Sequence, residues 1–347
     1  MNELGIVAIG RNEGERLKAC LASLQENSTD SVIVYVDSGS DDGSVAFARS
    51  LGVHVVELDR EIPFTAARAR NAGVSQLQKL SGSIRWIQFL DGDCQLQPQW
   101  MERAIECLET DSKLAAVCGR RRERFPDRSI YNALIDMEWD TPVGEALACG
   151  GDALFRLSAL HSVGGFTESM IAGEEPELCQ RLRCAGWGIR RIDAEMTLHD
   201  ADLHHFSQWW RRAKRFGHAA AEAFQRYGNR DEPVARAQLR GIVLWGGFIP
   251  VFNGLLLLID WRIGLFSLLI WPIQWARLTV AFARTHPWSF AARRSALQLL
   301  CKFAEFGGVV SYWSRRIAGR QSTLIEYKSG PSNENESASA PGTDASA

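Results

Sequence analysis

The sequence lacks the cysteine spacing of a structural zinc site, and it carries almost no net charge. None of its eight cysteines forms a Cys-x-x-Cys pair, and Cys20, Cys107 and Cys301 lie inside apolar patterns. Reduced thiols in a cytoplasmic setting therefore fit better than disulfides or zinc. The net charge of −2 argues against nucleic acid or any other bulk electrostatic partner.

A secretory signal is also missing from the start of the chain as given, where Glu3 leads directly into the apolar run from Leu4 to Ile9. With 347 residues, of which 46% are hydrophobic, we expect two domains or one domain with an appendage. The composition changes after about Arg240, where long uncharged runs begin.

Short apolar strand patterns alternate with helical patterns through the first third of the chain. Helical spacing is seen around Leu17 to Leu24, in Val45 to Leu51 and in Thr65 to Leu80. The predicted strands are Leu4 to Ile9, Val32 to Val36, Val53 to Leu58 and Ile84 to Leu90. This alternation predicts an α/β fold with a doubly wound, mostly parallel sheet.

Two carboxylates follow the apolar strand Ile84 to Leu90, in the tripeptide Asp91-Gly92-Asp93. Ligands of open α/β sheets bind beyond the carboxyl ends of the strands. Closely spaced oxygen donors suit Mg²⁺ or Mn²⁺ carrying substrate phosphates. An Asp-Gly turn that only ends the strand is the simpler alternative.

The order of six short motifs carries a family resemblance. They are Gly10-Arg11-Asn12-Glu13, Val36-Asp37-Ser38-Gly39-Ser40-Asp41-Asp42-Gly43, Ala69-Arg70-Asn71-Ala72-Gly73, Asp91-Gly92-Asp93, Gly150-Gly151-Asp152 and Gly173-Glu174-Glu175-Pro176-Glu177-Leu178. Together they resemble the family-2 glycosyltransferases of GT-A fold over roughly Leu4 to His218. Each motif is weak alone, and the signal lies in their order.

The resemblance implies roles for residues at the donor side. Asp37 matches the acid that contacts the base or ribose of a sugar nucleotide, and Arg70 matches a donor-site residue. Asp91 and Asp93 match the metal-diphosphate motif, with Mn²⁺ or Mg²⁺ as the cofactor. Ser38 stands where the family often has a second Asp, which leaves the nucleotide open. Helix N-capping is the alternative for Asp37.

Glu175 matches the general base of the family, in the second position of its acid pair. An inverting transfer needs a carboxylate that takes the proton of the acceptor hydroxyl. The family usually has Asp here, so this side chain is one methylene longer. Glu174, Glu175 and Glu177 also precede a helical pattern, so the alternative is that all three favour a helix N-terminus.

His199 and Arg211 complete the implied site. Related enzymes often place a histidine after the corresponding strand as a further metal ligand; a loop histidine bonded to Asp200 is the alternative. Gln208 to Arg212 is similar to the Gln-x-x-Arg-Trp motif of processive polysaccharide synthases, but Arg212 replaces its Trp, so elongation of a long polymer is not supported. Arg211 either pairs with the donor diphosphate or belongs to a basic interfacial helix, and the two roles are compatible.

Two apolar runs follow, Gly241 to Ile259 and Ile263 to Ala283, separated by Asp260-Trp261-Arg262. The first has no charged residue and approaches the ~20 residues that cross a bilayer. Lys and Arg on both outer flanks place the catalytic domain on the cytoplasmic side of the inner membrane. A buried or re-entrant hairpin is the alternative to full spanning.

The remaining chain is predicted to form one more helix and a tail. In 295–314 a polar stripe crosses an otherwise apolar helix, which favours a helix that lies in the membrane surface or packs on the hairpin. The predicted domains are therefore 1–230, catalytic, and 231–325, helical and membrane-associated, with a disordered tail at 326–347. The polar stripe consists of Ser295, Gln298, Lys302 and Glu305.

The expected function is an inverting glycosyltransferase that moves a sugar from a nucleotide-diphosphate donor to a hydroxyl of a lipid-linked or envelope or exopolysaccharide acceptor. Membrane lipid is the other expected partner. Transfer to a polyprenyl phosphate is a narrower alternative, which depends less on a general base because the acceptor is already an anion. A non-catalytic nucleotide-binding membrane scaffold is an alternative of another class. A nucleotidyltransferase would need a glycine-rich phosphate loop, of which Gly10 to Glu13 is a poor version.

Overall fold

The first half of the sheet is built from parallel strands joined by helices. The computed structural model describes residues 3–28, 31–227 and 233–319. Strands β1 (Leu4–Gly10), β2 (Val32–Asp37), β3 (His54–Glu57) and β4 (Trp86–Asp91) lie in the order β3-β2-β1-β4 and pair in parallel. The connecting helices are α1 (Glu15–Asn27), α2 (Ser44–Ser50) and α3 (Ala66–Leu80).

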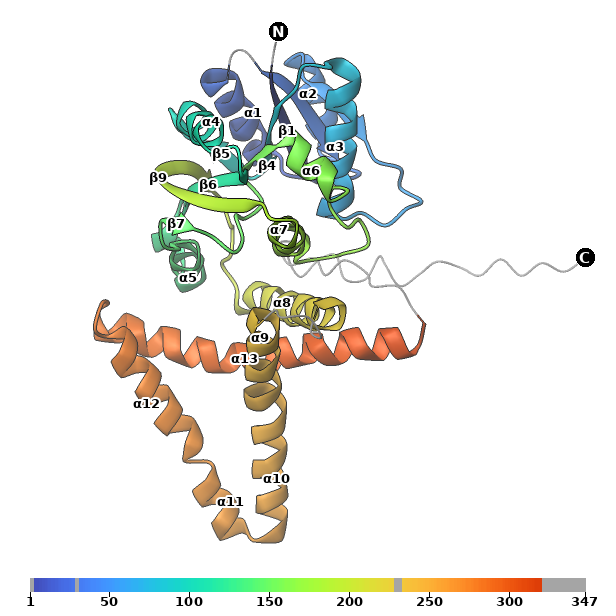
Figure 1. The fold of residues 1–347 in the computed structure, drawn as a ribbon. Coiled ribbons are helices and arrows are strands. Elements are labelled where there is room, and N and C mark those ends of the chain that lie inside the picture. Colours follow the sequence, from blue (N-terminus) through green and yellow to red (C-terminus); the bar gives the residue numbers. More distant parts are fainter. Residues whose placement is uncertain (1–2, 29–30, 228–232, 320–347) are drawn as a thin grey trace, which may run out of the picture.

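Helices cover both faces of this sheet, so its central strands are apolar along nearly their whole length (Figure 1). The strand and helix predictions for this half are confirmed to within two residues for each strand. Helix α3 packs on β1 with so little space that a Cβ at Gly73 would collide with Val7. This close approach fixes the position of Arg70, one turn earlier on the same helix.

The second half of the sheet is mixed. It contains β5 (Cys94–Leu96), β6 (Leu114–Glu123), β7 (Gly144–Glu145), β8 (Leu154–Arg156) and β9 (Gly188–His199). Strand β8 runs antiparallel between β4 and β6, and β6 pairs in parallel with β9. Strand β9 also pairs with β5, opposing His199 to Cys94. That pairing brings the end of β9 to the residues that follow β4.

Short helices complete the α/β domain. They are α4 (Trp100–Thr110), the 3₁₀ turn η1 (Pro126–Arg128), α5 (Ile130–Glu138), α6 (Leu157–Ser162) and α7 (Glu174–Cys184). The doubly wound, mostly parallel sheet predicted from the sequence is confirmed, with an antiparallel strand inserted at β8.

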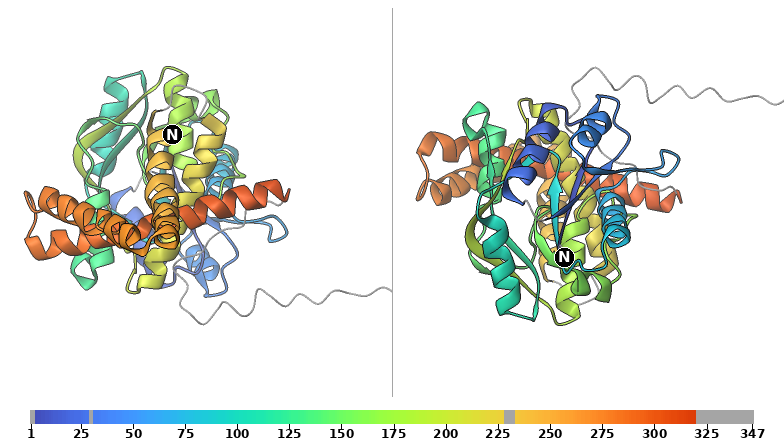
Figure 2. Two further views of the ribbon diagram at one scale, coloured as in Figure 1. Left: turned by 90° about the horizontal axis from the view of Figure 1, so that it is seen from below. Right: turned by 90° about the horizontal axis from the view of Figure 1, so that it is seen from above.

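Two long helices, α8 (Phe206–Tyr227) and α13 (Trp288–Ile317), cross beneath the sheet domain (Figure 1). Seen from below, α13 extends across the width of the molecule (Figure 2, left). Their backbones touch because glycine lies at the crossing: a Cβ at Gly217 would collide with the carbonyl of Glu305, and one at Gly308 with the carbonyl of Lys214. The crossing fastens the C-terminal helices to the sheet domain.

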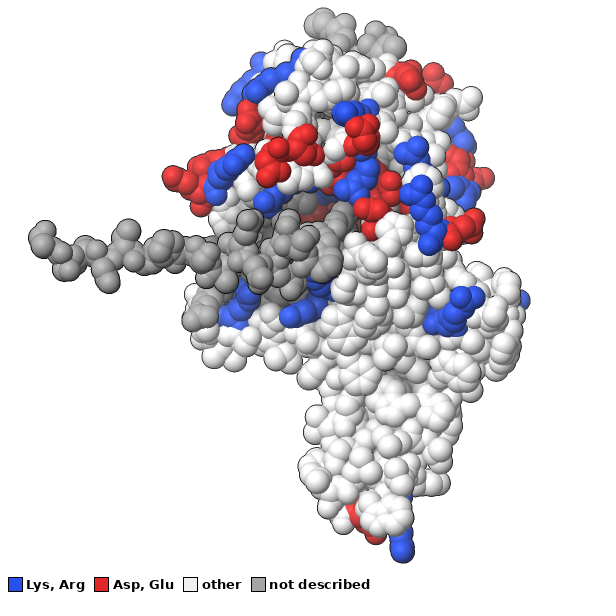
Figure 3. Space-filling model, turned by 180° about the vertical axis from the view of Figure 1, so that it is seen from behind, with Lys and Arg blue, Asp and Glu red and all other residues white. Residues whose placement is uncertain are grey.

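A helical hairpin projects from this layer. One arm is continuous through α9 (Pro233–Val243), the π-helical η2 (Leu244–Phe248) and α10 (Ile249–Ile259). The other consists of α11 (Trp261–Ser267) and α12 (Ile270–Phe282), with a break between them. The segments Arg236–Ile259 and Trp261–Phe282, of 24 and 22 residues, are long and apolar enough to cross a membrane. Figure 3 shows their surface as a nearly uncharged stalk.

The polar stripe of the predicted helix at 295–314 packs inward. The helix is longer than predicted, and Ser295 and Glu305 are buried. The carbonyl of Lys302 lies against Gly246 of η2, and its ammonium pairs with Glu305 at 2.6 Å. Of the two predicted arrangements, packing on the hairpin is therefore the one observed for this stripe. The predicted tail at 326–347 and the domain boundary at 230/231 fall outside the described residues.

Candidate active site

Asp91 is the last residue of β4, and two arginines neutralise it. Arg70 Nη2 donates to Asp91 Oδ1 at 2.8 Å, and Arg121 Nη2 lies 3.6 Å from Oδ2. Gly151 approaches so closely that a Cβ there would lie 2.6 Å from Arg70 Nη2 and 3.1 Å from Asp91 Oδ2. The 150–152 loop therefore forms one wall beside the carboxylate.

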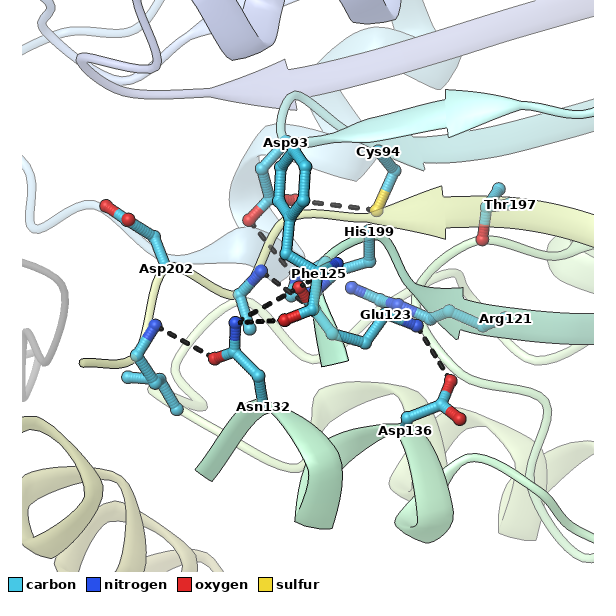
Figure 4. Close-up of polar contacts among 12 residues, drawn as sticks. Asp93, Cys94, Arg121, Glu123, Phe125, Asn132, Asp136, Thr197, His199 and Asp202 are labelled. Atoms are coloured by element: carbon cyan, nitrogen blue, oxygen red, sulfur yellow. Dashed lines mark hydrogen bonds and ion pairs between the residues drawn. The ribbon is translucent and has the colours of Figure 1, made fainter. Parts of the chain in front are cut away.

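Asp93 faces His199 from the neighbouring strand. Asp93 Oδ2 and His199 Nε2 are 3.3 Å apart, and both side chains are at least nine-tenths buried. The other ring nitrogen, Nδ1, is 3.3 Å from Glu123 Oε2 (Figure 4). The edge of the ring contacts Trp139, with the centroids 4.6 Å apart. His199 is thus held between two carboxylates, and its predicted alternative, a loop histidine bonded to Asp200, is not observed.

This arrangement suits a divalent cation. Asp93, Cys94 and His199 offer ligand atoms that all lie within 4.8 Å of one another. Two ligands at ~2.1 Å from one octahedral ion would be roughly 3 Å apart, close to the observed separation of Asp93 and His199. A carboxylate on the far nitrogen of a ligating histidine is the usual way to fix its tautomer, and Glu123 occupies that position. Asp91 lies just outside this cluster, engaged by its arginines.

Asp152 is fully buried and ties the site together. Its Oδ1 accepts from the backbone N–H of Asp91 at 3.0 Å, and its Oδ2 lies 3.2 Å from Arg121 Nη1 and accepts from Thr197. Burial raises the pKa of Asp152, and the Arg121 charge opposes that effect. Arg121 in turn stacks over Trp139 at 4.3 Å. Asp152 and Arg121 together therefore hold the backbone of Asp91 and the Trp139 ring, which contacts His199, in place.

Arg70 links the donor-side acids to the start of α7. Its Nη1 donates to Glu174 Oε1 at 2.7 Å while Nη2 holds Asp91. Burial lowers the pKa of Arg70, but the charges of Asp91 and Glu174 outweigh that effect, so the pKa is raised overall. Glu174 is therefore connected to Asp91 through Arg70.

Glu175, the next residue, contacts Cys149, at the start of the loop that contains Gly151. Its Oε1 accepts from the backbone N–H of Cys149 at 2.6 Å and from the thiols of Cys149 and Cys179 at 3.2 and 2.9 Å. Cys149 is two residues from Gly151, which is at most about 7.6 Å of backbone. Glu175 is buried, but no ion pair engages it among the described residues, and the hydrogen bonds shown use only Oε1.

Asp37 organises its own loop. Its Oδ2 accepts from the backbone N–H groups of Gly39 and Ser40, both at 2.8 Å, and its Oδ1 accepts from the hydroxyls of Tyr35 and Ser40. The N-cap of α2 is Gly43, so the helix-capping alternative for Asp37 is wrong. The carboxylate is buried at the carboxyl end of β2, next to β1 and on the same edge as Asp91.

Arg211 lies half-buried on α8, the helix that follows the β9 segment. Gln208, which begins the motif containing Arg211, has a local role: its Oε1 accepts from the backbone N–H groups of His204 and His205. Arg212, in place of the motif's Trp, pairs with Glu138 of α5 at 2.9 Å. These contacts anchor the start of α8 under the site.

Comparison with known proteins shows a similarity to one family. Residues 6–159, less than half of the chain, match the family described as Glycosyl transferase family 2. The match covers the strands from β1 to β8 and includes the predicted donor-side acids Asp37, Asp91 and Asp93.

Two curated relatives match longer stretches of the chain. Glycosyltransferase AglE of Haloferax volcanii is 25% identical over 201 residues, covering 55% of this chain and 64% of the relative, so the chain spans less than two thirds of its length. Succinoglycan biosynthesis protein ExoA of Rhizobium meliloti is 28% identical over 263 residues, covering 69% of this chain and 78% of the relative.

Among solved structures, a mannosyltransferase from Pyrobaculum calidifontis, in complex with GDP-Man and Mn²⁺, has a TM-score of 0.59 at 16% identity. The similarity covers 90% of this chain and 87% of that one. At this identity the likeness shows a shared fold, and the chain has a GT-A fold followed by a C-terminal helical region with two apolar helices.

Several residues of the candidate site were not found by sequence reasoning. Arg121 and Glu123 were not singled out, although their alternation along β6 directs both into the site while Arg122 faces solvent and pairs with Glu195. Charged residues at i and i+2 in a strand were the available signal. Register shifts between 118 and 121 hide that signal from simple counting.

Glu177 provides a stability prediction. Burial would raise its pKa, but hydrogen bonds from Arg181, Tyr227 and Thr167 outweigh burial and lower it. Because its pKa is lower in the folded state, Glu177 stabilises the fold at pH values above its unfolded pKa of about 4.3. This stabilisation is lost as the pH falls through the folded-state pKa. We expect Glu177→Gln to lower the free energy of unfolding by about 2 kcal/mol at pH 7 and to weaken its decline in acid.

Thermal unfolding of the detergent-solubilised chain between pH 3 and 7 measures both effects. Glu109→Gln, at an exposed position on α4, is the control and should follow the wild type. If Glu177→Gln kept the wild-type midpoint at pH 7, the hydrogen bonds that join α7 to Tyr227 would contribute nothing to stability.

Proposed function

We propose that this protein is an inverting glycosyltransferase that transfers a sugar from a nucleotide-diphosphate donor to a hydroxyl of a lipid-linked or exopolysaccharide acceptor at the cytoplasmic face of the membrane. One observation carries the proposal. Gly151 of the 149–151 loop lies against Asp91 and Arg70. Cys149 of the same loop donates its backbone N–H to Glu175. A cation site and an uncommitted carboxylate oxygen therefore border the same loop.

The donor diphosphate would be bound through Mn²⁺ or Mg²⁺ held by Asp91, Asp93 and His199. Such a cation supplies positive charge to the departing diphosphate. Glu123 holds His199 through Nδ1, which leaves Nε2 directed at Asp93 for the shared ligand. Hard cations prefer oxygen and imidazole, so the Cys94 thiol, whose pKa burial raises, is the weakest of the nearby donors.

Other side chains would position the nucleotide sugar. Asp37 shapes the loop after β2, where the base and ribose are proposed to lie, and Arg70 holds Asp91 in place. Arg121 keeps a permanent positive charge beside Asp91. Arg211 is proposed to contact the diphosphate from α8, for which its planar guanidinium is suited.

Glu175 is proposed as the general base. Its Oε1 is fixed by the Cys149 N–H, so the carboxylate is oriented before an acceptor arrives. Oε2 would then accept the proton of the acceptor hydroxyl as that oxygen attacks the anomeric carbon. A retained base favours a hydroxyl acceptor over a polyprenyl phosphate, whose oxygen is already anionic.

The hairpin supports a membrane location. A helix of 24 residues is about 36 Å long, more than the ~30 Å hydrocarbon core. Its far end carries Asp260 and Arg262, which would reach the opposite interface. Lysines and arginines return at the level of α8 and α13 (Figure 3), the arrangement expected when the sheet domain faces the cytoplasm.

A cavity at the base of the hairpin supports a lipid-linked acceptor. It has a volume of about 720 Å³ and lies where α8 meets α9 and η2. Arg236 and Arg240, one helical turn apart, line it together with apolar side chains. The apolar lining residues are Phe224, Leu239, Val243, Leu244 and Phe248. Two cationic groups beside an apolar lining suit a lipid with a phosphate head group. The similarity to ExoA favours a polysaccharide unit as the sugar acceptor.

The test is a thermal-shift panel of nucleotide sugars with and without Mn²⁺, followed by assays of donor hydrolysis and transfer. A ligand that binds only the folded chain raises its unfolding temperature, by the equivalent of about 2.7 kcal/mol at 100 times its Kd. We expect one nucleotide class, GDP- or UDP-linked, to stabilise the chain only with the metal. Metal-dependent binding without any turnover would favour the non-catalytic scaffold instead.

A further inference from the structure

Two thiols and a carboxylate converge in a buried cluster on the acceptor side of the site. Cys149 Sγ and Cys179 Sγ are 3.5 Å apart, and Glu175 Oε1 lies within 3.2 Å of both. Their ligand atoms all lie within 4.8 Å of one another, and all three residues are buried. The residues come from the loop before Gly150 and from successive turns of α7, 26 to 30 positions apart, so no Cys-x-x-Cys spacing signals them.

The donor set is chemically unlike that of the Asp93 and His199 site. Thiolates are soft ligands that select Zn²⁺ and similar cations, whereas Mn²⁺ and Mg²⁺ prefer oxygen. A further thiol is near: burial first, with the charges of Glu175 and Cys179 next, raises the pKa of Cys118 to about 12. We therefore expect the cluster of Cys149, Cys179 and Glu175 to bind soft cations such as Zn²⁺, and the Asp93 and His199 site to bind Mn²⁺ or Mg²⁺.

We propose that Cys149, Cys179 and Glu175 form an inhibitory binding site for a thiophilic divalent cation of the Zn²⁺ class. Binding converts both thiols to thiolates and releases two protons to solvent, while Glu175 supplies a carboxylate oxygen. A cation bound at Oε1 lowers the basicity of the carboxylate, and with it the ability of Oε2 to take the proton of the acceptor hydroxyl. The inhibition rests on the proposed function of Glu175, and the binding does not.

Protons compete with the cation at this cluster. Burial raises the pKa of both thiols, to about 11 for Cys179, so both are protonated at neutral pH. Affinity for the cation should consequently rise with pH, because each step toward higher pH makes the two thiols easier to deprotonate. The titratable groups that face the two thiols are Glu175 and the Cys118 thiol.

The experiment uses the full chain in detergent, with excess Mg²⁺ present, titrated with Cd²⁺ as a spectroscopic probe. Cd²⁺ bound by thiolate absorbs in the ultraviolet by charge transfer, so the signal reports the ligand itself. We expect a band in the wild type that grows from pH 6.5 to 8.5. Cys149→Ser and Cys179→Ser should each lose it or reduce it to about half, since one of two thiolates is gone.

Two control variants identify the cluster responsible. Cys184→Ser, at an exposed position on α7, should keep the full band. Cys94→Ser removes the thiol beside Asp93 and should also keep it; loss of the band in this variant would assign the cation to the other cluster and overturn the proposal. Thermal unfolding of each variant shows whether it is folded. An unchanged band in folded Cys149→Ser and Cys179→Ser would equally overturn it.

A second arm separates this inference from the proposed function. Zn²⁺ at concentrations that fill the Cd²⁺ site should abolish transfer by the wild type and by Cys184→Ser, and added Mn²⁺ should not restore it. Full transfer activity with the site filled would overturn the inhibitory role. If no donor and acceptor pair gives transfer in any protein, the proposed function fails, and the absorption experiment still decides whether the cation site exists.

Discussion

Replacing Asp93 by alanine is expected to lower kcat/KM for sugar transfer by about 1,000-fold or more. Asp93 is the acid that faces His199, and its loss removes one of the oxygens proposed to hold the divalent cation. Charge stabilisation of a departing diphosphate by a cation is worth several kcal/mol, and about 4 kcal/mol corresponds to a factor of 1,000. Metal-dependent donor binding should disappear with it.

Steady-state transfer assays and thermal shifts with the donor identified from the panel measure both losses. Asp193→Ala is the matched control, because Asp193 lies on the same strand as His199 with its side chain exposed. This control should keep wild-type kinetics. If Asp93→Ala kept metal-dependent donor binding, the cation would be held by other residues.

Replacing Glu175 by glutamine is expected to lower kcat by about 100- to 10,000-fold, the usual contribution of a general base. Glutamine has nearly the same shape, and its amide oxygen can still accept from the Cys149 N–H, so the fold around it should persist. Donor binding with Mn²⁺ should stay within about twofold of the wild type, because the donor-side acids are unchanged.

The neighbouring acid gives a sharp comparison. Glu174→Gln removes the carboxylate that pairs with Arg70, which also holds Asp91, so we expect mainly a higher KM for the donor. Glu145→Gln, exposed on β7, should change neither constant. If Glu174→Gln abolished kcat and Glu175→Gln did not, the base would be Glu174, and the acceptor would approach from the Arg70 side.

The parts of the site that sequence could predict are those set by local pattern. Asp37, Asp91 and Asp93 each follow an apolar strand, and parallel strands bring such ends to one edge, so their placement followed from periodicity alone. His199, which the family resemblance pointed to, is the last residue of β9. The family resemblance added the roles, which local pattern does not contain.

The parts that sequence could not predict depend on pairings between distant segments. Glu123 reaches His199 only because β6 and β9 pair in parallel through several register shifts. The Cys149–Cys179 contact requires the loop before Gly150 to fold over α7. The stripe on α13 could equally have faced lipid; close glycine contacts with α8 and η2 decide that it faces protein.

The most direct measurement is a crystal structure with Mn²⁺ and the donor nucleotide bound, in which anomalous scattering locates the ion. We predict a single strong peak between Asp91, Asp93 and His199, with the free oxygen of Glu175 facing the sugar of the bound donor. A peak elsewhere in the chain, or a Glu175 carboxylate separated from that sugar by protein atoms, would contradict the proposed active site.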